Sequence, residues 1–243
     1  MESEIFARRK EEHSVELSKL LHLYLTIKLI KKMMSKNKEF ELEVERIKAI
    51  FFSAQETFYI VEELYHENDV SDKEIYTKNM NSFFYYCKIY FWRNTVIELS
   101  KLFNHRDNET FNLIKFIKKL KPNGHFKSLK YDELFLDSIL KRIDESQNAI
   151  NNLILQRDKM YAHEDRNNQD VNNQTSFLDI KKLLDICKDL LQKITNQHFG
   201  THLQFEMINS PKQSLKYLIE CIIKGEQVIE TEHLALIKSI NNQ

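Results

Sequence analysis

The residues best suited to chemistry stand together in one short segment, residues 157–165, which reads RDKMYAHED. An arginine guanidinium can hold two phosphate oxygens at once. A histidine imidazole titrates near neutral pH, so it can accept or donate a proton during a reaction. Arg157, Asp158 and His163 therefore form a combination suited to phosphodiester chemistry, in which Asp158 would orient the ring or hold the guanidinium.

The spacing of Arg157 and His163 limits how the two can act together. At about 100° per residue, they lie about 120° apart on an ideal α-helix. Arg157 instead shares a face with Tyr161, and Lys159 shares a face with His163. The two functional groups can converge only if the last turn of the helix frays, or if a second copy of the chain supplies the other half across a two-fold axis.

Spacing alone is weak support for a site, because Arg8 and His13 show a similar separation near the N-terminus. The simpler interpretation of Arg157 and His163 is an exposed helix end that forms ion pairs with the acidic residues after the histidine. On spacing alone, we favour this simpler interpretation.

The composition argues against most cofactor sites. The sequence has only 3 glycines in 243 residues, too far apart for a glycine-rich phosphate loop. This excludes a P-loop and a dinucleotide fingerprint. His198 and His202 are four residues apart but lack an evident third metal ligand. We therefore expect neither a cofactor nor a metal ion.

The same scarcity of glycine, together with only 2 prolines, predicts the fold class. Average usage is about 7% glycine and 5% proline. Turns depend on these residues, and strand-rich folds need many turns. The chain is therefore predicted to be all-α, an antiparallel helical bundle with no sheet larger than a short hairpin near residues 199–207.

Apolar spacing and capping patterns predict the elements that position the motif. Helices are expected at about residues 4–36, 39–65, 72–103, 109–120, 131–163, 176–197 and from 210 onward. The motif falls at the end of the fifth of these helices, just before a polar run at 166–174. Ser176 and Asp179 have the spacing of a capping box, and residues 121–124 (KPNG) form the clearest turn.

The helix expected at 72–103 is unusually aromatic. Its aromatic residues are Phe83, Phe84, Tyr85, Tyr86, Tyr90, Phe91 and Trp92. Because apolar residues occur nearly all round it, we predict that it is the central helix and that these rings pack in the core. Stacking on nucleic-acid bases is the alternative, which we disfavour because basic residues are not interleaved among the rings.

Charge and cysteine usage indicate the compartment and the partners. Lys+Arg and Asp+Glu both number 36, whereas a dedicated duplex-DNA binder usually has a basic excess. A net charge of zero does not exclude a local basic pocket or a transient RNA substrate. The 3 cysteines include no close pair, which indicates reduced thiols and a cytoplasmic protein. The charged start does not resemble a signal peptide, and the most apolar stretch, 20–30, is too short to span a membrane.

Residues 157–165 resemble the Arg-polar-(several residues)-His signature of the HEPN superfamily. They are most similar to its abortive-infection AbiU-like branch, in which a segment of the type RDKxYAHxD ends a long helix. Residues 91–103 resemble an earlier helix of that branch, which ends in a pattern similar to LELxxLF. The resemblance covers about residues 71–197. Asp165 departs from some family toxins, which carry there a tyrosine that a partner enzyme modifies.

The resemblance implies a HEPN-like antiparallel helical bundle that dimerises. The expected organisation is a single all-helical domain, 1–243, with a HEPN-like core at about 71–197. Additional N-terminal helices would occupy 4–66, and additional C-terminal helices would occupy 210–242.

The resemblance also implies an activity, that of a metal-independent endoribonuclease in phage defence (abortive infection) or in a toxin–antitoxin system. Arg157 would then bind the scissile phosphate, His163 would transfer a proton, and Asp158 would support them. Lys159 and Tyr161 would contact the RNA. Attack by the substrate's own 2′-hydroxyl would leave a cyclic phosphate.

The expected partners are an RNA substrate, a second copy of the chain and an antitoxin or other defence-system protein, with no membrane. The alternative is a non-catalytic HEPN-like helical module for protein interaction, or for nucleotide or RNA sensing.

Overall fold

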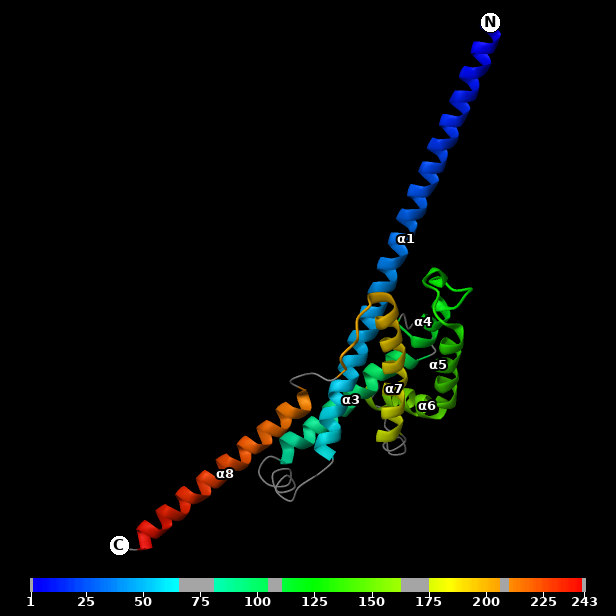
Figure 1. The fold of residues 1–243 in the computed structure, drawn as a ribbon. Coiled ribbons are helices and arrows are strands. Elements are labelled where there is room, and N and C mark those ends of the chain that lie inside the picture. Colours follow the sequence, from blue (N-terminus) through cyan, green and yellow to red (C-terminus); the bar gives the residue numbers. More distant parts are fainter. Residues whose placement is uncertain (1, 66–80, 105–110, 163–174, 206–209, 242–243) are drawn as a thin grey trace. The chain divides into compact units, whose positions relative to one another are not determined.

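The computed structural model describes residues 2–65, 81–104, 111–162, 175–205 and 210–241 (Figure 1). Every regular element in these ranges is a helix, which confirms the all-α prediction. The chain divides into two compact units, Met1–Glu45 and Arg46–Gln243. In the described ranges, no helix is both long enough and apolar enough to cross a membrane.

The N-terminal helix α1 (Glu2–Tyr65) is continuous, so the predicted break near residues 37–38 is wrong. That stretch contains neither proline nor glycine, and a polar run of lysine and asparagine lowers helix propensity only slightly. Within the second unit, α1 buries a stripe with three- and four-residue spacing. Its members are Ile47, Phe51, Ala54, Phe58 and Val61.

Helix α3 (Asn81–Phe103) packs against α4 and α6. Rings from three helices meet beside it: the Trp92 ring centroid lies 5.3 Å from that of Phe177, which lies 5.6 Å from that of Phe58. A polar contact also joins α3 to α1, because the hydroxyl oxygens of Thr57 and Thr95 are 3.0 Å apart. These contacts hold one side of α3 in the bundle.

The aromatic residues of α3 are mostly not in the core. Phe84 is 1% exposed, as predicted. The prediction of core packing is wrong for four others, whose exposed fractions lie between 56% and 62%: Phe83, Tyr85, Tyr86 and Tyr90. Phe91 and Trp92 are half-buried. Periodicity failed here because a helix that is apolar all round can still have neighbours on one side only.

Helix α4 (Leu113–Leu120) begins later than predicted, because the Asn112 side chain caps it by accepting hydrogen bonds from the backbone N–H groups of Ile114 and Lys115. The predicted turn at 121–124 follows and is confirmed. A Cβ atom on Gly124 would lie 2.2 Å from the Lys119 carbonyl oxygen, so only glycine fits there.

The single helix predicted at 131–163 is divided. After the short helix η1 (Lys127–Leu129), it forms α5 (Glu133–Glu145) and α6 (Gln147–Gln156), with a break at Ser146. Asp132 caps α5 by accepting from the Leu134 N–H at 3.0 Å. Apolar periodicity continues through the break, which explains why it was missed.

Helix α7 (Phe177–Ile194) packs against α5 and begins with the predicted capping box of Ser176 and Asp179. The π-helical turn η4 (Thr195–Phe199) follows and ends at Gly200, whose φ is +63°. Residues 201–205 form no strand. The rest of the segment in which a hairpin was allowed lies outside the described residues.

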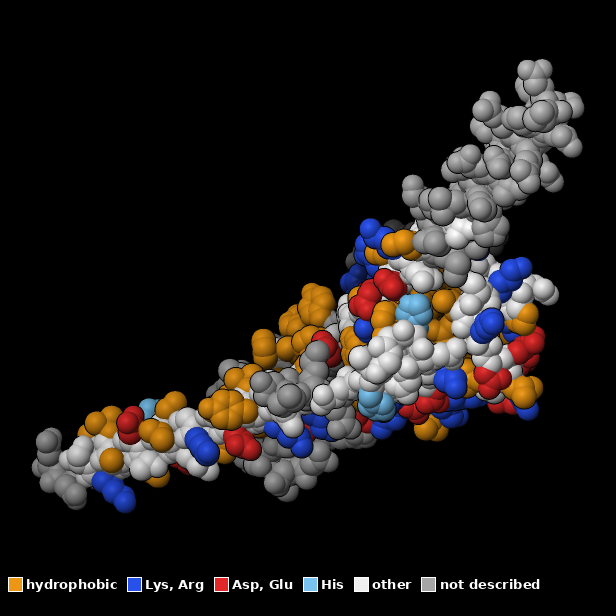
Figure 2. Space-filling view, turned by 45° about the horizontal axis from the view of Figure 1, so that its top comes forward, with side chains coloured by type: hydrophobic (Ala, Val, Ile, Leu, Met, Phe, Trp, Pro, Cys, Tyr) orange, Lys and Arg blue, Asp and Glu red, His pale blue; other side chains and the backbone are white. Residues whose placement is uncertain are grey.

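The last helix, α8 (Pro211–Asn241), continues through Gly225 without a break. Its first half packs on a cluster formed by Leu64, Phe84 and Ile219. From residue 224 to 240 every residue is exposed, including several large apolar ones. Figure 2 shows these hydrophobic side chains along α8.

Candidate functional site

The motif begins where α6 ends. After Gln156 the chain continues as η2 (Arg157–Ala162), which is a π-helix rather than an α-helix. Turns of this kind are rare and occur frequently at functional sites. The offset calculated for an ideal α-helix therefore does not describe the motif as it folds.

Arg157 is held by its neighbour in the sequence. Its Nε donates to Oδ1 of Asp158 at 2.9 Å, and its Nη2 lies 2.8 Å from the same oxygen. The Arg157 side chain is 14% exposed and that of Asp158 is 26% exposed. The carboxylate thus fixes the guanidinium at a site that solvent reaches only partly.

A third side chain reaches Arg157 from α3. Nη1 of Arg157 donates to the Ser100 hydroxyl at 3.4 Å, and that hydroxyl donates to the Ile97 carbonyl at 2.7 Å. Ser100 is 0% exposed, and α3 packs against both α6 and η2 at this end. Sequence reasoning missed Ser100; its only signal was a small polar residue at a buried position of the segment 91–103.

The end of α3 that carries Ser100 is itself fixed. The N–H of Asn104 donates to the Ser100 carbonyl at 2.9 Å, and the Asn112 side-chain amide donates to the Asn104 carbonyl. Both asparagines are almost fully buried. Because buried polar groups that are satisfied in this way rigidify their surroundings, Ser100 provides a fixed anchor for Arg157.

One buried acceptor beside the motif has no partner among the described residues. Gln156, immediately before Arg157, is 2% exposed, and its Oε1 makes no hydrogen bond there. A buried carbonyl oxygen without a hydrogen bond is costly. The end of α6 therefore has a buried side-chain acceptor, Gln156 Oε1, that its own helix does not satisfy.

The structure brings Arg157 and Asp158 together, and Lys159 is exposed beside them on η2. The Tyr161 backbone also belongs to η2, but its side chain lies outside the described residues. His163 lies outside them entirely. The predicted convergence of Arg157 and His163 therefore stays a prediction.

Two of the three cysteines, Cys87 and Cys187, do not offer a competing nucleophile. Burial raises the pKa of the Cys187 thiol far above its ordinary value, and burial also raises the pKa of Cys87. A raised pKa disfavours the thiolate, which is the reactive form. Thiol chemistry at these two positions is disfavoured.

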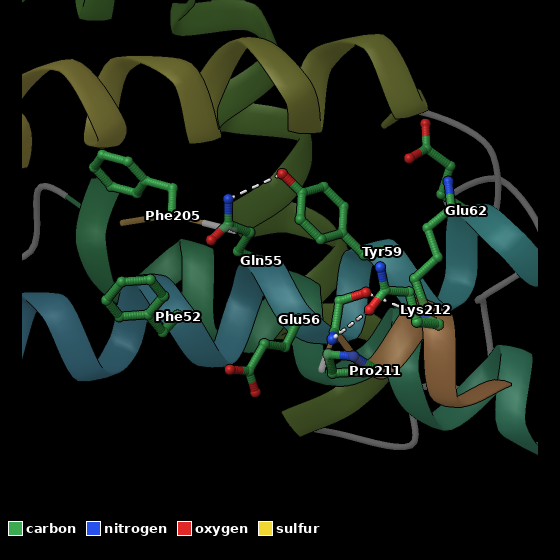
Figure 3. Close-up of a pocket in the computed structure, with 10 residues that line it drawn as sticks. Phe52, Gln55, Glu56, Tyr59, Glu62, Phe205, Pro211 and Lys212 are labelled. Atoms are coloured by element: carbon green, nitrogen blue, oxygen red, sulfur yellow. Dashed lines mark hydrogen bonds between the residues drawn. The ribbon is translucent and has the colours of Figure 1, made fainter. Parts of the chain in front are cut away.

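A separate pocket of about 250 Å³ lies between α1, Phe205 and the start of α8 (Figure 3). In it, the Gln55 amide donates to the Tyr59 hydroxyl at 3.0 Å. The charged residues that line it are Glu56, Glu62 and Lys212. Its carboxylates outnumber its cations, so it is poorly suited to binding a phosphate backbone.

An all-helical bundle in which residues Arg157–Ala162 continue the end of a helix, with His163 next in the sequence, is the arrangement expected of a HEPN-type domain. The family model HEPN_AbiU2, described as AbiU2, matches residues 37–217. The chain therefore belongs to the AbiU2 family of HEPN domains, and its role is of the HEPN type, related to abortive infection. The matched region is wider than the resemblance seen in the sequence, at both ends. No curated protein and no solved structure gives a significant match.

Proposed function

We propose that this protein is a metal-independent endoribonuclease of a phage-defence or toxin–antitoxin system, which cleaves RNA through a composite Arg/His site in a homodimer. The observation that carries this proposal is the guanidinium of Arg157, held by Asp158 and Ser100 at the start of the family motif. A guanidinium fixed in advance can bind a phosphate without losing further freedom.

In the proposed reaction, Arg157 binds the oxygens of the scissile phosphate and offsets the charge that develops on them. The substrate's 2′-oxygen attacks the adjacent phosphorus, and the bond from phosphorus to the 5′-oxygen breaks. His163 transfers protons, taking one from the 2′-hydroxyl or giving one to the leaving 5′-oxygen. The products are a 2′,3′-cyclic phosphate and a 5′-hydroxyl. Lys159 and Tyr161 contact the RNA.

A dimer would bring Arg157 and His163 from two copies of the chain to one site. In an isologous dimer, residues near the two-fold axis lie beside their own copies. Two η2 segments at such an axis would supply two arginines and two histidines to one site. One histidine could then act as the base and the other as the acid. An antitoxin or another defence-system protein is the expected regulator.

A non-catalytic interaction module of the same fold is the second candidate. It is favoured by the apolar side chains exposed along the second half of α8, among them Leu234, Leu236 and Ile237. Exposed apolar surfaces of this kind mark sites of protein interaction. The two candidates differ in what happens to RNA.

The deciding experiment incubates the purified protein with total RNA, with and without a chelator, and analyses the ends of the products. Cleavage that survives chelation and leaves cyclic phosphates supports the nuclease. Intact RNA, together with capture of a protein partner by α8, supports the interaction module.

A further inference from the structure

The N-terminal half of α3 presents a group of rings to solvent, here called the α3 aromatic face. It consists of Phe83, Tyr85, Tyr86 and Tyr90. The rings contact one another: the centroids of Tyr85 and Tyr86 are 5.8 Å apart, and those of Tyr86 and Tyr90 are 6.4 Å apart. Large apolar patches on a protein surface mark interaction sites.

The helix that carries the α3 aromatic face is packed against the bundle on another side. On another side of the same half of α3, Phe84 is buried, and Cys87 and Phe91 pack on the cluster that includes Leu64 and Ile219. The helix is therefore fixed in the bundle while its aromatic face stays uncovered by the described residues.

The charge of this half of α3 is positive. Residues 81–97 of α3 include Lys88 and Arg93 and no aspartate or glutamate. Lys88 falls between Tyr86 and Tyr90 in the sequence and lies over the Tyr65 ring, 4.9 Å from its centroid. Arg93 is exposed. The expectation that no basic residues accompany the rings is therefore wrong.

The α3 aromatic face leads to the motif. Positions seven residues apart on an α-helix drift by only about 20°, so Tyr86, Arg93 and Ser100 lie along one side of α3. At about 1.5 Å per residue, this line is about 21 Å long. Its far end is the hydroxyl that contacts Arg157.

We propose that the α3 aromatic face binds the single-stranded part of the RNA substrate and directs it to Arg157. This inference rests on the proposed function and names the form of RNA that the site takes. Tyr86 and Tyr90 stack on unpaired bases, and Arg93 contacts the backbone. Aromatic rings beside cationic side chains are the usual means of binding single strands, whereas paired bases are stacked inside a duplex and do not reach such rings.

A second copy of this chain is the competing occupant. If the face paired with itself, Lys88 and Arg93 of one copy would approach the same cations of the other copy, and residues 81–97 contain no carboxylate that could attract them. A polyanion matches the charge better, so the observations favour RNA.

The test measures binding apart from cleavage. The probe is a short fluorescent single-stranded oligoribonucleotide with 2′-O-methyl groups, which lacks the attacking hydroxyl, and binding is followed by anisotropy. The Tyr86→Ala/Tyr90→Ala variant should bind about tenfold more weakly for each ring removed. Arg93→Ala should lower the slope of log affinity against log salt by about 0.7.

Matched variants make the result specific. Tyr217→Ala removes a ring on α8 that is 70% exposed and should leave the affinity unchanged. Tyr86→Phe/Tyr90→Phe keeps both rings and should bind as the parent does. A duplex probe of the same sequence should bind the parent and the double alanine variant equally.

Two results overturn the inference: unchanged affinity in the double alanine variant, or conversion of a parent dimer to a monomer by the same variant in sedimentation. The second result would assign the face to a second copy. Failure of the proposed function is a different result, in which the parent binds the probe through these rings but leaves unmodified RNA intact.

Discussion

In the C-terminal half of α3, Leu99 and Leu102 are 0% exposed, whereas Tyr86 and Tyr90 in the N-terminal half are 56% and 62% exposed. The half with the larger and more numerous rings is thus the half that solvent reaches. Both halves belong to one helix, and both are rich in apolar residues.

The neighbours of each half explain the difference. The C-terminal half lies against α6 and η2, and Asn112 fixes its end to the start of α4. Among the described residues, the N-terminal half packs around Leu64 and α8, and at Trp92 it meets Phe177, while its aromatic face stays uncovered. One helix is therefore a packed scaffold at one end and presents exposed rings at the other.

The largest effect is expected where the scaffold holds the motif. Arg157→Ala or His163→Ala should lower the rate of RNA cleavage by about 10²–10⁴-fold, as loss of a group that acts on the transition state does. Chelation should not change the parent rate. Arg8→Ala and His13→Ala, which repeat the residue types elsewhere, should leave the rate unchanged. Cleavage by His163→Ala at the parent rate would end the nuclease proposal.

The buried half should dominate stability. Leu99→Ala should lower the free energy of unfolding by about 2–5 kcal/mol, because it leaves a cavity in a packed core. Tyr90→Ala should change it by less than about 1 kcal/mol, because the ring is already exposed. Urea unfolding followed by circular dichroism measures both. Equal losses in the two variants would show that the two halves do not differ as described.

Replacement of Ser100 should lower the rate of RNA cleavage more than it lowers the stability of the fold. Ser100→Ala removes the hydrogen bond to the Ile97 carbonyl and the one from Arg157, and each should contribute about 1 kcal/mol of stability. The guanidinium of Arg157 would also lose its contact with α3, so kcat should fall several-fold, with little change in binding of the uncleavable probe. A variant with unchanged kcat and reduced stability would limit Ser100 to a structural role.

The smallest effect is expected from Tyr86→Phe. The ring stays and only an exposed hydroxyl is lost, so stability should change by less than about 0.5 kcal/mol. Parent and variant should both sediment as dimers at micromolar concentration. If the parent is only a monomer under these conditions, the composite site is contradicted.

Local signals in the sequence predicted local features of the fold well. The capping box at Ser176 and Asp179 and the turn that ends at Gly124 depend on neighbouring backbone atoms, so their residue types suffice. The sequence did not predict the break at Ser146, because apolar periodicity continues through it. It also did not predict that α1 is continuous, because a polar run interrupts the apolar pattern there. In the candidate site, the sequence indicated Arg157 and Asp158 by their residue types, but it did not predict the contact of Arg157 with Ser100.

By itself, the sequence determined the helical class and the family. Few glycines and prolines leave little besides long helices, and the motif is a continuous run of residues. Which apolar residues are buried, and which side chain anchors Arg157, depends on how the helices pack. The reason is physical: burial depends on which segments approach a residue, and α3 meets Arg157 across 57 positions of the chain. No local pattern contains that information, so the exposed rings and Ser100 emerged only from the packed helices.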